Sequence, residues 1–156
     1  MDRTLVMLKP DAVARGLIGR IIARLEAKGL KIVALKMARL GTALAERHYA
    51  EHKGKPFYEP LIRFVTSGPT VFLILEGKDA VAVVRKMAGA TFGPAAEPGT
   101  VRGDLGMSNR FNLIHGSDSP EAAAAEISLF FTPGELIEWN PAAWPWTYDF
   151  STGEPV

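Results

Sequence analysis

The chain contains no cysteine, no long apolar run and, beyond residue 110, no lysine or arginine. The absence of cysteine excludes disulfide bonds, thiolate metal sites and a catalytic thiol, and it suits a reducing compartment. The first residues, MDRTLVMLKPD, hold no apolar stretch long enough for a signal peptide or a membrane span. We therefore expect a cytoplasmic protein with no membrane partner.

Positive charge is missing from the C-terminal part of the chain. Residues 111–156 hold seven acidic residues and no basic one, whereas residues 1–110 hold all 18 basic residues and 10 acidic ones, so a −7 and a +8 segment sum to +1. Such a total argues against a non-specific polyanion binder, whose affinity comes from many phosphate contacts. We expect no nucleic-acid partner, while a small anionic ligand stays compatible. The length and the 47% hydrophobic content predict one domain over residues 1–156.

Short apolar runs alternate with segments of helical periodicity, which predicts a mixed fold. The predicted strands are Thr4–Leu8, Leu30–Leu40, Thr70–Glu76 and Phe111–His115. Helices are predicted around Leu17–Leu25, from Thr42 to about His52, from Pro56, after Asp79, after Ser119 and, by capping-box spacing, at Thr132–Glu135. Residues 89–110 have no clean period, and the proline-containing tail from Asn140 is expected to dock along an irregular path.

Without the two helices between the second and third strands, the element order is βαββαβ. This order predicts an α+β, ferredoxin-like fold, in which a four-stranded antiparallel sheet has helices packed on it. The fold by itself assigns no function.

Neither the phosphate-binding loop G-x-x-x-x-G-K-[ST] nor the dinucleotide fingerprint G-x-G-x-x-G occurs in the sequence. A nucleotide would therefore need another kind of site. The polar residues that could supply one are Lys9, Arg85, Thr91, Arg102 and Asn112. Each of them, taken alone, is equally compatible with an ordinary surface position.

The segment NLIHGSDS places a titratable imidazole at the end of an apolar strand. His115 is followed by Gly116, Ser117 and Asp118, and Glu126 lies in the next predicted helix. Such neighbours can fix the tautomer of an imidazole that acts as a nucleophile. A core or capping histidine bonded to the backbone is the alternative, and spacing alone leaves both open.

Two other patterns compete with this interpretation. His48-Tyr49-Ala50-Glu51-His52 matches H-x-x-E-H, an inverted zinc-peptidase pattern with both imidazoles on one helix face. A zinc hydrolase would need a third protein ligand, and two incidental histidines are the favoured explanation. A βαββαβ RNA-binding module is disfavoured, because no strand resembles its aromatic-rich signature.

Several separated motifs together resemble those of nucleoside diphosphate kinases. They are TLVMLKPDAVARGLIG, HYAEHKGKPFY, SGP before TVFLILEG, PGTVRGD and NLIHGSDS, in the order of that family. The resemblance runs from about Arg3 to the tryptophan-rich tail. It implies transfer of the γ-phosphate of a nucleoside triphosphate, mainly ATP, to nucleoside diphosphates by a ping-pong route that maintains NTP and dNTP pools.

The resemblance also implies roles for individual residues. His115 would become the phosphohistidine, with Glu126 and Ser117 holding its ring. Lys9 and Asn112 would contact ribose hydroxyls and nearby phosphate oxygens, whereas the phosphates would bind Arg85, Thr91 and Arg102. Phe57 would stack on the base beside Leu61, with Tyr49 and His52 near the site, so that H-x-x-E-H needs no zinc. Such stacking would accept every base, because a π-face carries no base-edge code.

The family further implies Mg²⁺ carried on the nucleotide, with Asp118 as the nearest protein group, and a homo-oligomer, either a hexamer or a tetramer built from dimers. Phe92-Gly93 and Asn109-Arg110-Phe111 depart from the family's pattern, and these departures concern affinity for the base more than catalysis. A non-enzymatic scaffold is disfavoured, because every motif position expected for chemistry is filled.

Overall fold

The computed structural model describes residues 1–156 and contains one four-stranded antiparallel sheet. Its strands are β1 (Asp2–Leu8), β2 (Lys31–Arg39), β3 (Pro69–Gly77) and β4 (Ile114–Gly116), arranged in the order β2-β3-β1-β4. This order and the antiparallel pairing of all neighbours confirm the predicted ferredoxin-like topology. The two central strands, β1 and β3, are almost completely buried.

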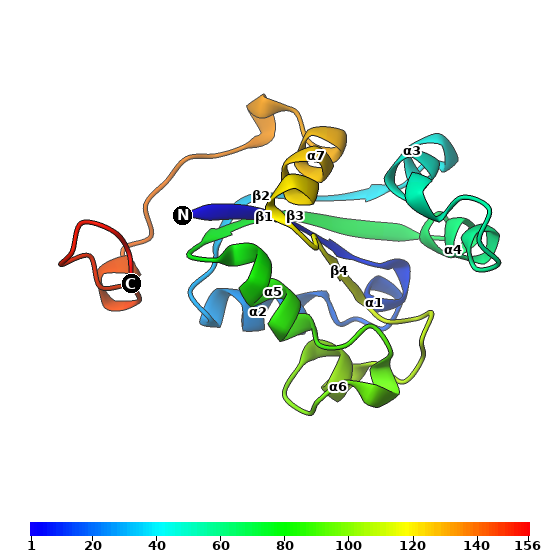
Figure 1. Ribbon diagram of the computed structural model, residues 1–156, viewed down its shortest axis with the longest axis horizontal. Helices are drawn as coiled ribbons and strands as arrows, with labels where there is room; N and C mark the ends of the chain where they lie inside the picture. Colours follow the sequence, from blue (N-terminus) through cyan, green and yellow to red (C-terminus); the bar gives the residue numbers. More distant parts are fainter.

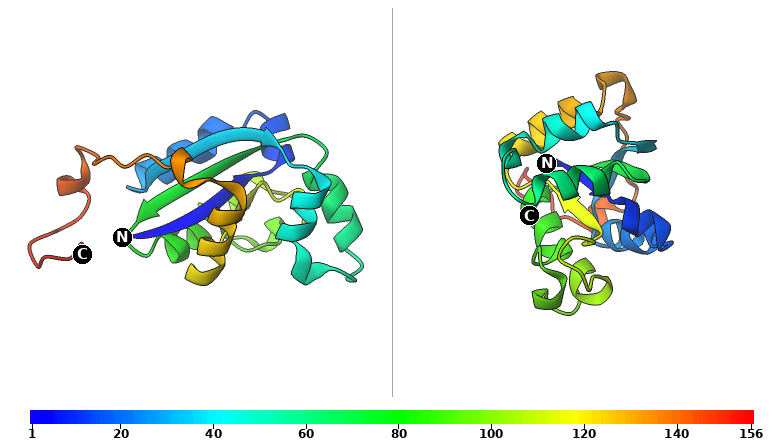
Figure 2. Two further views of the ribbon diagram at one scale, coloured as in Figure 1. Left: turned by 90° about the horizontal axis from the view of Figure 1, so that it is seen from above. Right: turned by 90° about the vertical axis from the view of Figure 1, so that its right-hand side faces the viewer.

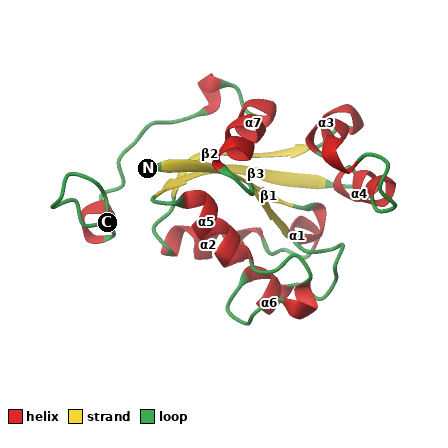
Figure 3. Cartoon of the chain, viewed as in Figure 1, coloured by secondary structure: helices red, strands yellow, loops and turns green.

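Helices cover both faces of the sheet (Figures 1 and 2). One face carries α1 (Pro10–Ala14), α2 (Ile18–Ala27), α5 (Ala80–Ala88) and α6 (Val101–Leu105), and the other carries α3 (Thr42–His48), α4 (Tyr58–Val65) and α7 (Pro120–Phe130). Short 3₁₀ turns lie at Ala50–His52, Gly93–Ala95, Pro133–Glu135 and Trp144–Trp146. Figure 3 shows how the loops join these layers.

The apolar runs of the central strands serve both layers, because successive side chains of a strand point to opposite faces. In β1, Val6 and Leu8 pack under α2 and α5, whereas Leu5 and Met7 pack under α4 and α7. The unbroken run TVFLILE in β3 has the same explanation. It alternates between two cores rather than between core and solvent.

Some predicted helix boundaries hold and others shift. Ser119 caps α7 by accepting a hydrogen bond from the backbone N–H of Ala122 at 3.0 Å, and Thr132 and Glu135 form the predicted capping box. Asp79 does precede α5, but its φ is +52° and its side chain makes no capping bond. Two further starts were wrong, since Thr42 is already inside α3 and α4 begins two residues after Pro56.

The sequence patterns missed two short helices. α1 begins at Pro10, directly after Lys9, and α6 lies within residues 89–110, where no period was found. Each has only five residues, which is too short to establish an apolar repeat. Both matter for the site, because they lie next to Lys9 and carry Arg102.

The C-terminal tail docks at the end of the sheet where β1 begins (Figure 1). The indole N–H of Trp139 donates to the carbonyl of Ile32 at 2.8 Å, and the hydroxyl of Tyr148 donates to that of Gly29 at 3.3 Å. Buried Lys31 bonds the carbonyl of Trp139 and forms an ion pair with Glu76 at 2.6 Å. The tail therefore lies at the opposite end of β1 from Lys9.

Candidate active site

His115 lies on β4, directly opposite Met7 of β1, with its side chain toward the layer of α7. Its Nε2 lies 2.6 Å from Oε2 of Glu126 on α7. The hydroxyl of Ser117 donates to the same carboxylate at 3.4 Å and accepts from the backbone N–H of Leu5 at 3.2 Å. The structure thus brings together His115 and the two residues predicted to hold its ring, Glu126 and Ser117.

This bond decides which ring nitrogen is available. An ionised carboxylate only accepts hydrogen bonds, so Nε2 of His115 carries the hydrogen and donates it to Glu126. In a neutral imidazole the other nitrogen, Nδ1, then holds the lone pair. The side chain of His115 is 23% exposed, so a ligand can reach it.

A strained turn explains why β4 is shorter than the predicted strand. Leu113 has a φ of +71°, and the N–H of Ile114 bonds the carbonyl of Asn112 at 2.8 Å, which is the pattern of a three-residue γ-turn. Such a backbone costs about 1–3 kcal/mol. The N–H of Lys9 and the carboxylate of Asp11 hold it by bonding the carbonyl and the N–H of Leu113.

Three cations gather beside this turn. The ammonium of Lys9 donates to Oδ1 of Asn112 at 2.8 Å, while burial and then repulsion from Arg102 lower the pKa of Lys9 to about 8. Burial and then repulsion from Arg85 also lower the pKa of Arg102. Like charges that repel one another at a site are stabilised by a bound anion. Lys9, Arg85 and Arg102 therefore form a candidate phosphate site.

Arg102 also holds the backbone around the site together. Its guanidinium donates to the carbonyls of Gly89, Asn112 and Ile114, at the end of α5, in the γ-turn and in β4. These bonds use three of its five N–H groups, which leaves two for a ligand. Arg85, in contrast, is exposed on α5.

The PGTVRGD motif builds the short helix that presents Arg102. Thr100 caps α6 by accepting from the N–H of Gly103 at 2.9 Å, and Asp104 bonds both the N–H of Gly99 and the guanidinium of Arg24. A Cβ at position 103 would lie 1.9 Å from the carbonyl oxygen of Glu97, so only glycine fits there.

His48 is a neighbour of the site that the sequence interpretation set aside. It ends α3, and its ring lies edge-on to that of His115 with centroids 4.9 Å apart. Burial and then the charge of His115 lower the pKa of His48 to about 4. Its Nε2 and the hydroxyl of the adjacent Tyr49 are both buried without a hydrogen-bond partner, and burial raises the pKa of Tyr49.

The signal for His48 was the H-x-x-E-H pattern, which the sequence interpretation favoured as two incidental histidines rather than a zinc site. One group of side chains has the spacing of metal ligands, and it contains His48, His115 and Glu126. His52 does not belong to it, because its ring lies against Phe57 at 5.2 Å and near Lys55. The pair of His48 and His52 therefore lacks the third ligand that the zinc-hydrolase hypothesis requires.

The remaining predicted site residues lie around these groups. Phe57, at the start of α4, is 47% exposed, and Leu61 is partly buried one turn later. The backbone carbonyl of exposed Thr91 accepts from the amide of Asn112 at 3.1 Å. Asp118 is exposed directly after Ser117.

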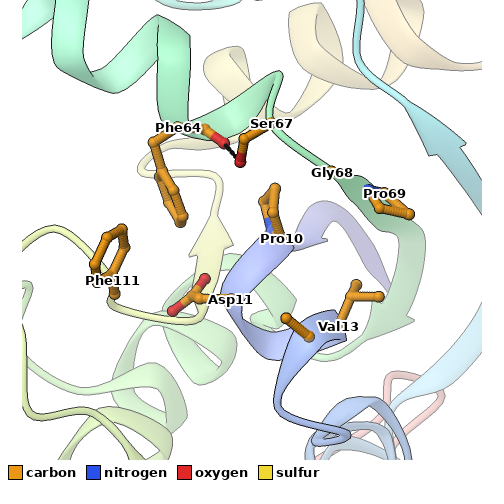
Figure 4. A pocket seen from close by; sticks show the side chains of 9 residues that line it. Pro10, Asp11, Val13, Phe64, Ser67, Gly68, Pro69 and Phe111 are labelled. Carbon is orange, nitrogen blue, oxygen red and sulfur yellow. Dashed lines mark hydrogen bonds between the residues drawn. The ribbon is translucent and has the colours of Figure 1, made fainter.

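A separate cavity of about 340 Å³ lies between α1, the end of α4 and the start of β3 (Figure 4). The rings of Phe64 and Phe111 contact each other there with centroids 5.0 Å apart. None of the cations, His115 or Glu126 lines this cavity. Phe111, one of the departures noted in the sequence, thus lines this cavity together with Phe64.

No helix of the chain is both long and apolar enough to cross a membrane.

The chain is similar to proteins of one family. A family model described as nucleoside diphosphate kinase matches residues 2–136. The nucleoside diphosphate kinase of Thermococcus kodakarensis is 56% identical over 151 residues, which cover 95% of this chain and 86% of that protein. That of Archaeoglobus fulgidus is 52% identical over 149 residues, covering 96% and 99% of the two chains. A solved structure of a halophilic nucleoside diphosphate kinase from Halobacterium salinarum, in complex with CDP, has a TM-score of 0.93 and 51% identity over 95% of this chain and 99% of that one.

Proposed function

This chain belongs to the nucleoside diphosphate kinase family, and on that premise we propose that His115 carries the phosphate between two nucleotides. The enzyme transfers the γ-phosphate of a nucleoside triphosphate to a nucleoside diphosphate. The observation that supports His115 is its 2.6 Å bond to Glu126, because this bond leaves Nδ1 as the nitrogen with the free lone pair.

In the first half-reaction, Nδ1 of His115 attacks the γ-phosphorus, and the bond from that phosphorus to the bridging oxygen breaks. The nucleoside diphosphate leaves with the electron pair of the broken bond. The hydrogen on Nε2 stays in its bond to Glu126, which stabilises the positive charge that develops on the ring. The second half-reaction is the reverse, with another nucleoside diphosphate as the acceptor.

The three cations supply the electrostatic part of this proposal. Phosphoryl transfer asks a protein mainly for positioning and for positive charge around the phosphate oxygens. Lys9, Arg85 and Arg102 would surround these oxygens, with Asn112 and Thr91 beside them. The hydroxyl of Tyr49 is a further donor, since it is buried without a partner.

The base would stack on the exposed ring of Phe57, with Leu61 and His52 beside it. Mg²⁺ would enter on the nucleotide and neutralise charge on its phosphates. It requires few protein ligands, because in such sites it keeps several waters and one or two carboxylates. Asp118 fits as a single contact of this kind, since its exposed carboxylate follows Ser117 directly.

We also propose that the enzyme is a homo-oligomer that works on cytoplasmic nucleotide pools. β2 is an edge strand, and its outward Leu35 and Met37 are 53% and 56% exposed. A second copy could cover such an apolar edge, which isolated proteins normally protect. Sedimentation velocity measures the assembly, and a monomeric mass would contradict an oligomer.

Labelling with γ-³²P-ATP tests the role of His115. We expect one acid-labile, base-stable phosphate per chain, which passes to added GDP or CDP. His115→Ala should take up no label, although its circular dichroism and melting temperature should stay near those of the wild type. Label that persisted in His115→Ala would assign the phosphate to another residue.

A further inference from the structure

We propose that His48, His115 and Glu126 form a binding site for Zn²⁺, and that zinc bound there blocks phosphorylation of His115. Each residue offers one ligand atom, and these atoms all lie within 4.8 Å of one another. The inhibitory part rests on the proposed function of His115, whereas the binding part does not.

The donor set suits zinc rather than magnesium. Two imidazoles and one carboxylate are a common ligand set of zinc sites that keep a fourth position for water. Mg²⁺ prefers six oxygen ligands in octahedral geometry, which this group does not offer. A zinc ion on these residues would therefore be distinct from the Mg²⁺ that the nucleotide carries.

The geometry needs only side-chain movement. Bonds of about 2.0–2.1 Å place the ligand atoms of a tetrahedral zinc site about 3.3 Å apart. The Nε2 of His115 and the Oε2 of Glu126 are 2.6 Å apart, so this pair must open slightly. The ligand atom of His48 must approach, and its ring lies at the end of α3, on the same side of the sheet as α7 (Figure 1).

A nitrogen of His48 without a hydrogen-bond partner also supports a metal ion at this position. Its Nε2 is buried without a hydrogen-bond partner, and a buried polar atom in that state costs about 1–3 kcal/mol. The phosphate-transfer mechanism proposed above gives this atom no partner. A metal ion would, since it accepts the lone pair of a neutral imidazole.

Zinc in this position would interfere with the nucleophile directly. It would take up the carboxylate of Glu126 and one nitrogen of His115, and so break the bond that orients the ring. It would also add two positive charges to the site, but it would supply no nucleophile in place of His115. Bound zinc and a correctly oriented His115 are therefore mutually exclusive.

Zinc titration of the full chain tests the binding part. Protein is treated with EDTA, dialysed into metal-free buffer without nucleotide, and titrated with ZnCl₂ by calorimetry and by competition with a chromophoric chelator. We expect one zinc per chain, bound at least tenfold more weakly by His48→Phe. Phenylalanine keeps an aromatic ring against His115, Tyr49 and Phe130, so the variant should fold, as its melting temperature will show.

His52→Phe is the matched control, because it makes the same change four residues away at a histidine outside the group. It should bind zinc as tightly as the wild type. Absence of stoichiometric binding by the wild type, or equal affinity in His48→Phe, would overturn the proposal. An excess of Mg²⁺ should not displace the zinc.

The inhibitory part is tested by the rate of label uptake from Mg-ATP at increasing zinc. The wild type should lose activity as the zinc site fills and recover it with EDTA. His48→Phe, compared with its own zinc-free rate, should need at least tenfold more zinc. Equal inhibition of both proteins would place the effect on the nucleotide and overturn this part. Zinc binding by a chain that takes no label even without zinc would support the metal site and overturn the proposed function instead.

Discussion

Two halves of the site are built differently. The cation half (Lys9, Arg85 and Arg102) contains Arg102, whose guanidinium bonds three backbone carbonyls, whereas in the histidine half (His115, Ser117 and Glu126) the side chains of His115 and Ser117 both bond the carboxylate of Glu126. Arg102 alone joins the end of α5, the γ-turn and β4. The side chain of His115 has one hydrogen-bonding partner, Glu126.

This difference predicts which residues contribute to the stability of the fold and which contribute mainly to the reaction. A residue that bonds several carbonyls of distant segments stabilises the fold even when no ligand is bound. A residue whose bonds only orient another side chain contributes little to folding and much to the reaction. Substitution of Arg102 in the cation half should therefore lower both stability and activity, whereas substitution of Glu126 in the histidine half should lower mainly activity.

Arg102→Ala should have the largest effect. The variant leaves the carbonyls of Gly89, Asn112 and Ile114 without their donor, so the free energy of unfolding should fall by about 3 kcal/mol. Activity should fall about a hundredfold or more through loss of a cation near the phosphate. Urea denaturation and steady-state kinetics measure the two losses.

Arg85→Ala is the control for Arg102→Ala, because Arg85 is an exposed cation of the same half. It should lower activity while changing stability by less than about 0.5 kcal/mol. Wild-type stability in Arg102→Ala would contradict the structural role of that guanidinium. From the sequence alone, Arg102 was expected only to bind phosphate, since nothing in PGTVRGD indicates which carbonyls it contacts.

Glu126→Gln should have a smaller effect than Arg102→Ala, and that effect should fall mainly on the rate of phosphate transfer rather than on stability. Glutamine has nearly the same shape but no charge, so it no longer stabilises the ring as positive charge develops on His115. We expect kcat to fall about tenfold to a hundredfold and stability to fall by about 1 kcal/mol or less. Glu121→Gln, an exposed change in the first turn of the same helix, is the control. A stability loss in Glu126→Gln as large as that of Arg102→Ala would remove the distinction between the halves.

The sequence predicted the fold well where periodicity extends over whole elements. The four strands and the helices α2, α5 and α7 follow from apolar repeats and caps, and the sheet order follows from their succession. The same signal failed at β4, where the predicted five-residue strand Phe111–His115 became Ile114–Gly116. The γ-turn at Leu113 depends on bonds to Lys9 and Asp11, about a hundred residues away, which no local pattern contains.

The residues of the site also fall into those that the sequence identified and those that it did not. The family motifs named His115, Ser117 and Glu126, and the structure brings these three together. His48 was interpreted as incidental, because the pattern that contains it pairs it with His52 and supplies no third zinc ligand. Its actual neighbours, His115 and Glu126, come from β4 and α7. Contacts of this kind depend on how layers stack, and spacing along the chain does not encode them.

The smallest expected effect is a pH dependence of KM that arises from the protonation of Lys9. Burial and repulsion from Arg102 lower its pKa to about 8, so the free enzyme loses this charge as the pH rises from 7 to 9. Because only the protonated ammonium attracts a phosphate, KM for the nucleotide should rise, by up to about tenfold at pH 9. Nucleotide phosphates are already fully ionised in this range, and kcat should change less, because a bound phosphate favours the charged lysine. Lys9→Arg keeps its charge throughout, so its KM should be flat with pH even if it binds more weakly. A flat KM in the wild type would mean that the charge of Lys9 does not determine affinity for the nucleotide.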